Sequence, residues 1–258
     1  MRFPRLFRRV LDPLTDRIPV PVLGGPNRGR LWSLASAGSG YGTGRRAADQ
    51  IRFLRSLIRP GDVVWDVGAH HGYVTLMAAA AVGESGVVHA FEPGERNARM
   101  LERHLRWNGA RNATPHRLAL GAADGEADFG GGYTSKMQAL GRGDERVIVR
   151  RGASLVADGD ARPPDVMKID VEGAEGDVLA GAAEILPADA RLVIAMHSPE
   201  ADAACREVLS ELGFSTFPTG GLERARSGTH GWPDDPDLVA VGPDGFLAPE
   251  LQAALGSL

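Results

Sequence analysis

Short apolar runs and helical patterns alternate along most of the chain. The apolar runs cover residues 63–67, 87–91, 114–120, 166–169 and 192–196. Apolar side chains at helical spacing follow at 73–81, 95–107, 174–186 and 201–212, and precede the first run at 45–59. Strands that are apolar nearly throughout are typical of a parallel sheet buried between two layers of helices. The pattern therefore predicts an α/β fold with a doubly wound, mostly parallel sheet.

Three regions depart from this alternation. Residues 121–162 contain glycine-rich turns and one predicted strand at 147–149, so we expect an insertion or hairpin there. Near the end, GFSTFP (213–218) and DLVAVG (237–242) predict two strands that form an antiparallel edge of the sheet. Residues 20–44 are rich in glycine, proline and serine and are predicted to be loop-like. We expect an N-terminal segment, residues 1–44, followed by a single domain over residues 45–258.

Composition narrows the class of protein. The net charge of −4 gives no general attraction to nucleic acid or to an anionic membrane. No stretch reaches the roughly 18 apolar residues that a membrane-spanning helix needs. The single cysteine, Cys205, is expected to be buried filler; it excludes an internal disulfide and fits a reducing compartment, so we expect a cytoplasmic protein.

The first 14 residues mix arginine with apolar side chains. They lack the apolar core and cleavage site of a signal peptide. A short amphipathic helix is predicted that packs on the domain, the alternative being a helix that lies on a partner or a membrane surface.

A glycine-bounded turn follows the first predicted strand. The sequence WDVGAHHG (65–72) places Gly68 and Gly72 where the chain enters a helix, a position that lets the backbone approach an anionic ligand group. The next strand ends in Glu92, a carboxylate that can accept both hydroxyls of a ribose. The spacing matches neither G-x-G-x-x-G nor the phosphate-binding loop G-x-x-x-x-G-K-[ST]. This narrows the ligand to a nucleoside without a pyrophosphate, such as S-adenosylmethionine.

Four blocks of the chain resemble the FkbM family of S-adenosylmethionine-dependent methyltransferases. The blocks are DVGAHHGYVTLMAA, VHAFEPGERNARMLERHLRWNG, RLALGAADGEADF and VMKIDVEGAEGDVLAGAAEIL. The resemblance runs from about residue 61 to residue 198, and KIDVEGAE is its most specific part. It implies a class I methyltransferase (Rossmann-like) fold, with a seven-stranded sheet that has one antiparallel edge strand. It also implies methylation of a hydroxyl on a sugar, a polyketide or a related natural product.

The resemblance assigns cofactor contacts by position. Glu92 matches the acid that binds the ribose. The other residues expected at the cofactor are Asp66, Gly68, Ala69, His70 and Gly72 in the first motif, and Ala119 and Leu120 beside the adenine. His70 stands where the family commonly has asparagine, and we expect it to contact the cofactor.

The adjacent histidines are not expected to form a metal site. Consecutive residues that enter a helix point about 100° apart, so His70 and His71 are poorly placed to bind one ion together. For His71, packing beneath the start of the helix and contact with the cofactor are both open.

Four polar side chains are predicted to lie at the reacting end of the site. Lys168, Asp170 and Glu172 accompany the end of one parallel strand, and His197 accompanies the end of the next. We expect His197 or Asp170 to act as a general base, with Lys168 paired to the acids. The alternative is a divalent metal held by Asp170, His197 and Glu172, which is not favoured because Lys168 would oppose a cation. Glu175 is interpreted as favouring the N-terminus of the following helix.

The predicted function is therefore an S-adenosylmethionine-dependent O-methyltransferase that acts on a small molecule. Two glycine-rich segments are candidate walls of the acceptor site, equally explained as connecting loops; their polar residues are Tyr41, Arg45, Tyr133 and Lys136. A protein that binds a nucleoside without catalysis is one alternative, and an NAD-dependent oxidoreductase is another.

Overall fold

The structure is a computed structural model that describes residues 14–38, 40–44, 48–130, 139–218 and 238–245. Some expectations fall outside these residues, namely the helix over residues 1–13 and the contacts of Arg45, Tyr133 and Lys136. No helix in the described ranges is long and apolar enough to cross a membrane.

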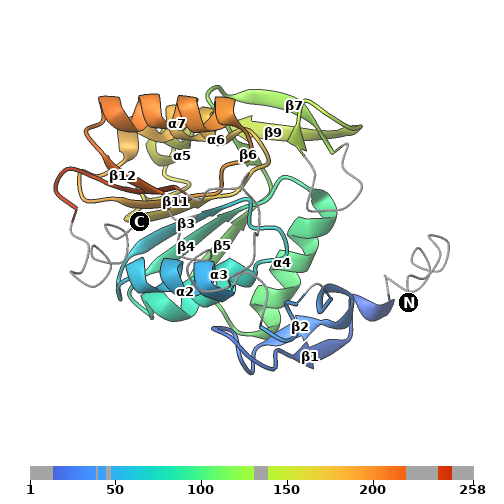
Figure 1. Ribbon diagram of the computed structural model, residues 1–258. Coiled ribbons are helices and arrows are strands. Elements are labelled where there is room, and N and C mark those ends of the chain that lie inside the picture. Colours follow the sequence, from blue (N-terminus) through green and yellow to red (C-terminus); the bar gives the residue numbers. More distant parts are fainter. Residues whose placement is uncertain (1–13, 39, 45–47, 131–138, 219–237, 246–258) are drawn as a thin grey trace.

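A seven-stranded sheet forms the centre of the described molecule (Figure 1), in the order β12-β13-β11-β10-β3-β4-β5. Its strands are β3 (Val63–Val67), β4 (Val87–Phe91), β5 (Ala113–His116), β10 (Val166–Ile169), β11 (Arg191–Ile194), β12 (Ser215–Pro218) and β13 (Leu238–Val241). β13 alone runs in the direction opposite to the other strands of this sheet. The doubly wound class I fold is confirmed. The antiparallel strand, however, lies one place in from the edge, because β12 pairs with its outer side.

Helices cover both faces of the sheet, as the alternating pattern predicts (Figure 1). The helices are α2 (Ala48–Leu57), α3 (Tyr73–Val82), α4 (Glu95–Trp107), α5 (Gly152–Ala157), α6 (Glu175–Ala182) and α7 (Pro199–Glu211), with short 3-10 turns η1 (Leu34–Ser36) and η2 (Ala183–Ile185). Leu76 of α3 and Leu101 of α4 belong to the core on one face. Leu179 of α6 and Leu209 of α7 belong to the core on the other face. Burial on both faces explains why the central strands are apolar at nearly every position.

A second sheet contradicts the single strand expected over residues 114–120. β5 ends at His116, whose partner Phe91 is the last residue of β4. The chain then leaves the main sheet, and β6 (Ala119–Leu120) pairs with β9 (Glu145–Arg150). β7 (Gly125–Gly130) and β8 (Ala139–Leu140) complete the order β6-β9-β7-β8. The strand expected at 147–149 and the hairpin expected in this region are confirmed.

The segment expected to be loop-like, residues 20–44, contains regular structure. β1 (Pro19–Pro21) and β2 (Leu31–Ser33) form an antiparallel ribbon that packs on α4. Trp32 is only 1% exposed, and its ring stacks on His104 with centroids 3.8 Å apart. The backbone N–H of Ser33 donates to Nε2 of the same histidine at 3.0 Å. Three-residue strands are too short to show alternation, which is why the sequence pattern does not reveal them.

Candidate active site

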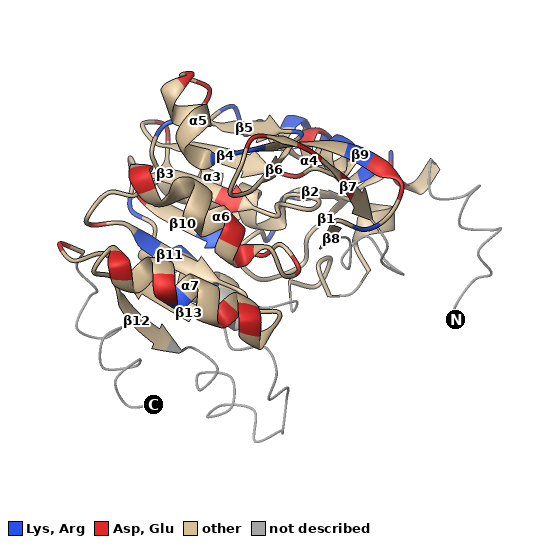
Figure 2. Cartoon of the chain, turned by 90° about the horizontal axis from the view of Figure 1, so that it is seen from above, with Lys and Arg blue, Asp and Glu red and all other residues tan. Residues whose placement is uncertain are grey.

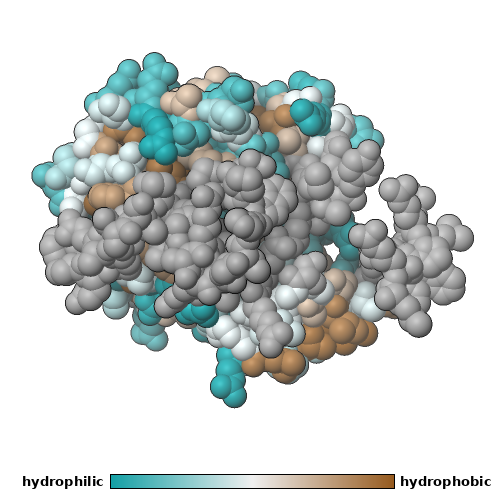
Figure 3. Space-filling model, in the orientation of Figure 1, coloured by the Kyte–Doolittle hydropathy of each residue, from teal (hydrophilic) through white to brown (hydrophobic). Residues whose placement is uncertain are grey.

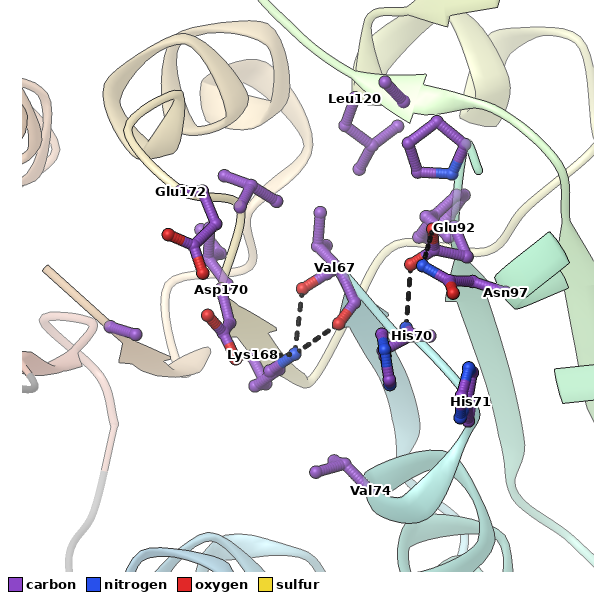
Figure 4. A pocket seen from close by; sticks show the side chains of 18 of the residues that line it. Val67, His70, His71, Val74, Glu92, Asn97, Leu120, Lys168, Asp170 and Glu172 are labelled. Carbon is purple, nitrogen blue, oxygen red and sulfur yellow. Dashed lines mark hydrogen bonds and ion pairs between the residues drawn. The ribbon is translucent and has the colours of Figure 1, made fainter. Parts of the chain in front are cut away.

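A cavity of about 860 Å³ opens where the parallel strands β3, β4, β10 and β11 end. Carboxyl ends of strands are where ligands bind in doubly wound sheets. The predicted residues that line it are Gly68, Ala69, His70, Glu92, Ala119, Leu120, Lys168, Asp170, Glu172 and His197. Figure 4 shows the carboxylates of Asp170 and Glu172 on one side of this space and Glu92 on the other. The structure therefore brings both predicted groups, from the cofactor motif and from the reacting end, into one cavity.

The turn between β3 and α3 depends on glycine. Gly68 has a φ of +75°, and a Cβ at this position would lie 1.9 Å from the carbonyl oxygen of Asp170. Gly72 has a φ of +85°, and a Cβ there would meet Leu101 at 2.4 Å. A side chain does not fit at Gly68, because the clash is with backbone, so the turn lies directly against the loop that carries Asp170. Gly72 does not line the cavity; it allows α4 to pack closely under the start of α3.

Glu92 is fixed by hydrogen bonds from the same turn and from the start of α4. Its Oε2 accepts the backbone N–H of His70 at 2.8 Å, and its Oε1 accepts the N–H of Gly94 at 3.0 Å and the amide of Asn97 at 3.1 Å. The side chain is nearly buried, and this burial raises the pKa of Glu92 to about 6, although the hydrogen bonds oppose the shift. Two carboxylate oxygens offer about four acceptor positions, so capacity remains for a ligand.

Asp66 is the other predicted cofactor residue that does not line the cavity. It is fully buried below the turn, where its Oδ2 accepts the hydroxyl of Thr75 at 2.6 Å. Its Oδ1 lies 3.2 Å from Nζ of Lys168, with which it is paired in register between β3 and β10. This position supports the turn from beneath rather than contacting a ligand directly.

Lys168 holds the ends of two strands together. Its ammonium donates to the carbonyls of Val67 at 3.1 Å and Gly68 at 2.8 Å, as Figure 4 shows. It also lies 3.6 Å from Oδ2 of Asp170. Burial opposes the charge, but the carboxylates of Asp66 and Asp170 outweigh it and raise the pKa of Lys168. The predicted pairing of Lys168 with Asp170 is confirmed, and the nearer acid, Asp66, is a partner that was not predicted.

His197 lies beside two carboxylates on the same side of the cavity. Its Nε2 lies 3.6 Å from Oδ1 of Asp170 and 3.8 Å from Oε2 of Glu172. The potential ligand atoms of these three residues lie within 4.8 Å of one another. Glu172 has a φ of +56°, a backbone conformation that is costly for a residue with a side chain. The arrangement can move a proton, or it can hold a divalent cation if the imidazole is neutral.

Glu175 is the site residue that sequence reasoning assigned to another role. It begins α6, it is completely buried, and its Oε1 lies 2.7 Å from Nδ1 of His197. Burial disfavours the charge on His197, but Glu175 first, and then Asp170 and Glu172, raise its pKa to about 9. The histidine is therefore protonated at neutral pH. An acid at the start of a helix already has a simple explanation, so no pattern in the sequence indicates this contact.

Both adjacent histidines line the cavity and both are half-buried. Their rings stack on each other, with centroids 3.8 Å apart. Burial, followed by the neighbouring His70, lowers the pKa of His71 well below its usual value. The group of potential metal ligands found among the described residues contains neither histidine.

Other positions complete the cavity wall. Tyr41, expected near an acceptor, lines it, and so do Phe129 of β7 and Arg142 from the β8–β9 turn, which the sequence analysis did not single out. Cys205 lies outside the cavity lining and is buried. Burial raises the pKa of its thiol to about 12, which agrees with a role as core filler.

Comparisons with known proteins point to one family. The model of the methyltransferase FkbM domain matches residues 66–216. A hexuronic acid methyltransferase from Haloferax volcanii is 29% identical over 178 residues, which cover 67% of this chain and 71% of the relative.

Solved structures show the same fold. A methyltransferase FkbM from Methylobacillus flagellatus KT has a TM-score of 0.50 at 18% identity, over 80% of this chain and 53% of that chain. A precorrin-6y C5,15-methyltransferase from Geobacter metallireducens has a TM-score of 0.50 at 13% identity, over 76% of this chain and 89% of that chain.

Proposed function

Because this chain belongs to the FkbM methyltransferase family, we propose that it transfers a methyl group from S-adenosylmethionine to a hydroxyl oxygen of a small molecule. The observation that carries the proposal is the shared cavity: the glycine turn and Glu92 lie at one side, and Asp170, Glu172 and His197 lie at the other. A cavity of about 860 Å³ is near the upper end of the range for small-molecule sites, which leaves room for a cofactor and an acceptor together.

The residues present fit the cofactor. Glu92 is a nearly buried carboxylate that lines the cavity, and about one of its four acceptor positions remains for a ribose hydroxyl. Backbone at Gly68, Ala69 and His70 lines the cavity before the N-terminus of α3, where a carboxylate is favoured. Ala119 and Leu120 supply apolar surface for the adenine. When bound, S-adenosylmethionine supplies the electrophilic methyl carbon.

Asp170 is the proposed proton acceptor. His197 holds its own proton at neutral pH because its pKa is about 9, so it is not suited to accept the proton of the hydroxyl. His197 and Lys168, at 3.6 Å each from the Asp170 carboxylate, limit its orientation. Glu172 lines the same side and orients the acceptor. A positioned base of this kind is typically worth about 10²–10⁴ in rate.

The acceptor class is proposed from the Haloferax relative, whose name specifies a hexuronic acid. A panel of glucuronic acid, galacturonic acid and neutral sugars, incubated with the purified chain and S-adenosylmethionine, should give a methylated product by mass spectrometry. Resistance of the product to mild alkali would identify an ether formed at a hydroxyl, whereas loss of the methyl group would identify an ester. Methyl transfer should continue in the presence of EDTA, since the proposed step uses no metal. If EDTA abolished the transfer and a divalent ion restored it, Asp170, Glu172 and His197 would be identified as ligands of a metal ion.

Two outcomes would reject the proposal. Tight binding of S-adenosylmethionine without transfer to any acceptor of the panel or of a cell extract would indicate a nucleoside-binding protein. Tight binding of NADH, with no affinity for S-adenosylmethionine in calorimetry, would indicate an oxidoreductase.

A further inference from the structure

Positive charge is concentrated at the start of a chain that is acidic as a whole. Residues 1–30 hold seven arginines and two aspartates, a net charge of +5, whereas the whole chain carries −4. Residues 31–258 therefore carry −9. Arg17 and Arg28 are exposed. Acidic residues are instead spaced along α6 and α7, as Figure 2 shows, on the sheet face opposite α3 and α4.

Exposed apolar side chains gather on the same segment. The described ranges contain five exposed large hydrophobic residues, and four of them lie between residues 14 and 34. These four, which we call the ribbon patch, are Leu14 (63% exposed), Ile18 (44%), Leu23 (70%) and Leu34 (45%). Ile18 and Leu34 are neighbours, because the N–H of Leu34 donates to the carbonyl of Ile18 at 2.9 Å. Figure 3 shows apolar surface over the ribbon of β1 and β2.

The ribbon is a firm base for this patch. Leu31 and Asn108 exchange two hydrogen bonds of 2.8 Å, which join β2 to the residue that caps α4. The amide of Asn27 donates to the carbonyl of Tyr73 at 2.7 Å and so joins the ribbon to α3. The apolar side chains are therefore displayed on a fixed element, with 44–70% of each residue left exposed.

Charge decides which partner fits. In a symmetric dimer the same patch lies on both subunits, so Arg17 and Arg28 of one subunit would be brought toward the same arginines of the other. Nucleic acid would engage the arginines but leave the leucines in water. An interface of anionic lipids satisfies both, since its phosphates attract arginine and its acyl boundary accepts leucine and isoleucine. Residues 1–13 continue the same composition, with four arginines among Phe3, Leu6 and Phe7.

We propose that the ribbon patch and the arginines around it dock this protein on the surface of a membrane that contains anionic lipids. The apolar side chains enter the boundary between headgroups and acyl chains, while Arg17 and Arg28 remain at the level of the phosphates. Docking is peripheral and reversible, and it leaves the cavity formed by the strand ends as the reaction site.

Sedimentation of the full chain with vesicles tests the proposal. Vesicles of phosphatidylcholine with phosphatidylglycerol should bind the protein, and pure phosphatidylcholine vesicles should bind it far more weakly. Ile18→Ser with Leu34→Ser should reduce binding by on the order of tenfold. Ile148→Ser is the matched control, since Ile148 is 53% exposed but lies on β9, and it should leave binding unchanged.

A second pair of variants tests the charge. Each arginine near the surface is worth about fivefold in binding, so Arg17→Ser with Arg28→Ser should weaken it by roughly 25-fold, and high salt should act in the same direction. Arg206→Ser, on α7, should have no effect. Three outcomes would each overturn the proposal. The first is that the protein binds no vesicles, and the second is that it binds neutral and anionic vesicles equally. The third is a concentration-dependent dimer that the patch variant abolishes.

Discussion

Glu175 illustrates how a buried carboxylate sets the charge of a neighbouring histidine. Its contact of 2.7 Å with Nδ1 of His197 directs Nε2 toward Asp170 and contributes to the pKa of about 9. Because this pKa lies above the value of about 6.5 for a free histidine, the contact adds stability that is full below about pH 6.5 and is lost as pH rises through about 9.

Glu175→Gln should lower the pKa of His197 by more than about one unit, since the amide carries no charge. The change is measured directly from the His197 ring resonances in an NMR titration. Urea melts of the natural chain should lose up to about 3 kcal/mol between about pH 6.5 and pH 9, and the variant should lose much less. Glu184→Gln, an exposed acid on η2, is the control. An unchanged His197 titration in Glu175→Gln would contradict this account.

Glu92 makes a prediction about cofactor affinity. Its pKa of about 6 means that the carboxylate is protonated in mildly acidic solution. The dissociation constant for S-adenosylmethionine should therefore increase by about tenfold for each pH unit below about 6. Calorimetry of Glu92→Gln should show weaker binding by about 10–100-fold and no such pH dependence. A natural chain whose affinity is flat across this range would remove Glu92 from the ribose site.

At the scale of elements, the turn after β3 and the loop after β10 are packed backbone against backbone. Gly68→Ala would place a methyl group 1.9 Å from the carbonyl oxygen of Asp170, in addition to the strain of a φ of +75°. Gly109→Ala, at the end of α4, carries a similar φ of +62° but meets no atom within 4 Å. This glycine isolates the cost of the backbone conformation, about 1–2 kcal/mol.

Gly68→Ala should cost at least about 2 kcal/mol more than Gly109→Ala in urea unfolding. It should also weaken cofactor binding, because the loop must move to admit the methyl group. Equal losses of stability in the two variants would show that the close approach relaxes freely.

The elements that the sequence predicts well are those buried on two faces. β3, β4, β10 and α4 begin and end where the sequence pattern places them. The three strands are covered by helices on both faces and are therefore apolar at most positions, which makes their bounds easy to recognise. The strand expected over 114–120 was wrong for a reason that periodicity does not contain: Ala119 leaves one sheet and pairs with Val149 in another. The contact between Lys168 and Asp66 could not be predicted from periodicity either. The two residues meet because of the register in which β10 pairs with β3.

At the scale of the whole molecule, we propose that residues 14–44 fold together with the rest of the described chain. Trp32 packs within the core that also contains Leu76 and Leu101. Trp32→Ala should therefore cost about 3–5 kcal/mol in a single unfolding transition. Leu34→Ala, two residues away and 45% exposed, should cost less than about 0.5 kcal/mol. A Trp32→Ala variant as stable as Leu34→Ala would separate the ribbon from the fold.

The contact between Gly68 and Asp170 also matters for protein engineering. A designer who wishes to change the acceptor by exchanging the loop after β10 also disturbs the turn that begins α3, since the two share a wall of backbone atoms. Residues 68–72 and 170–173 should be transplanted as one cassette. Libraries that vary the second stretch alone should be screened for retained cofactor affinity before they are screened for a new product.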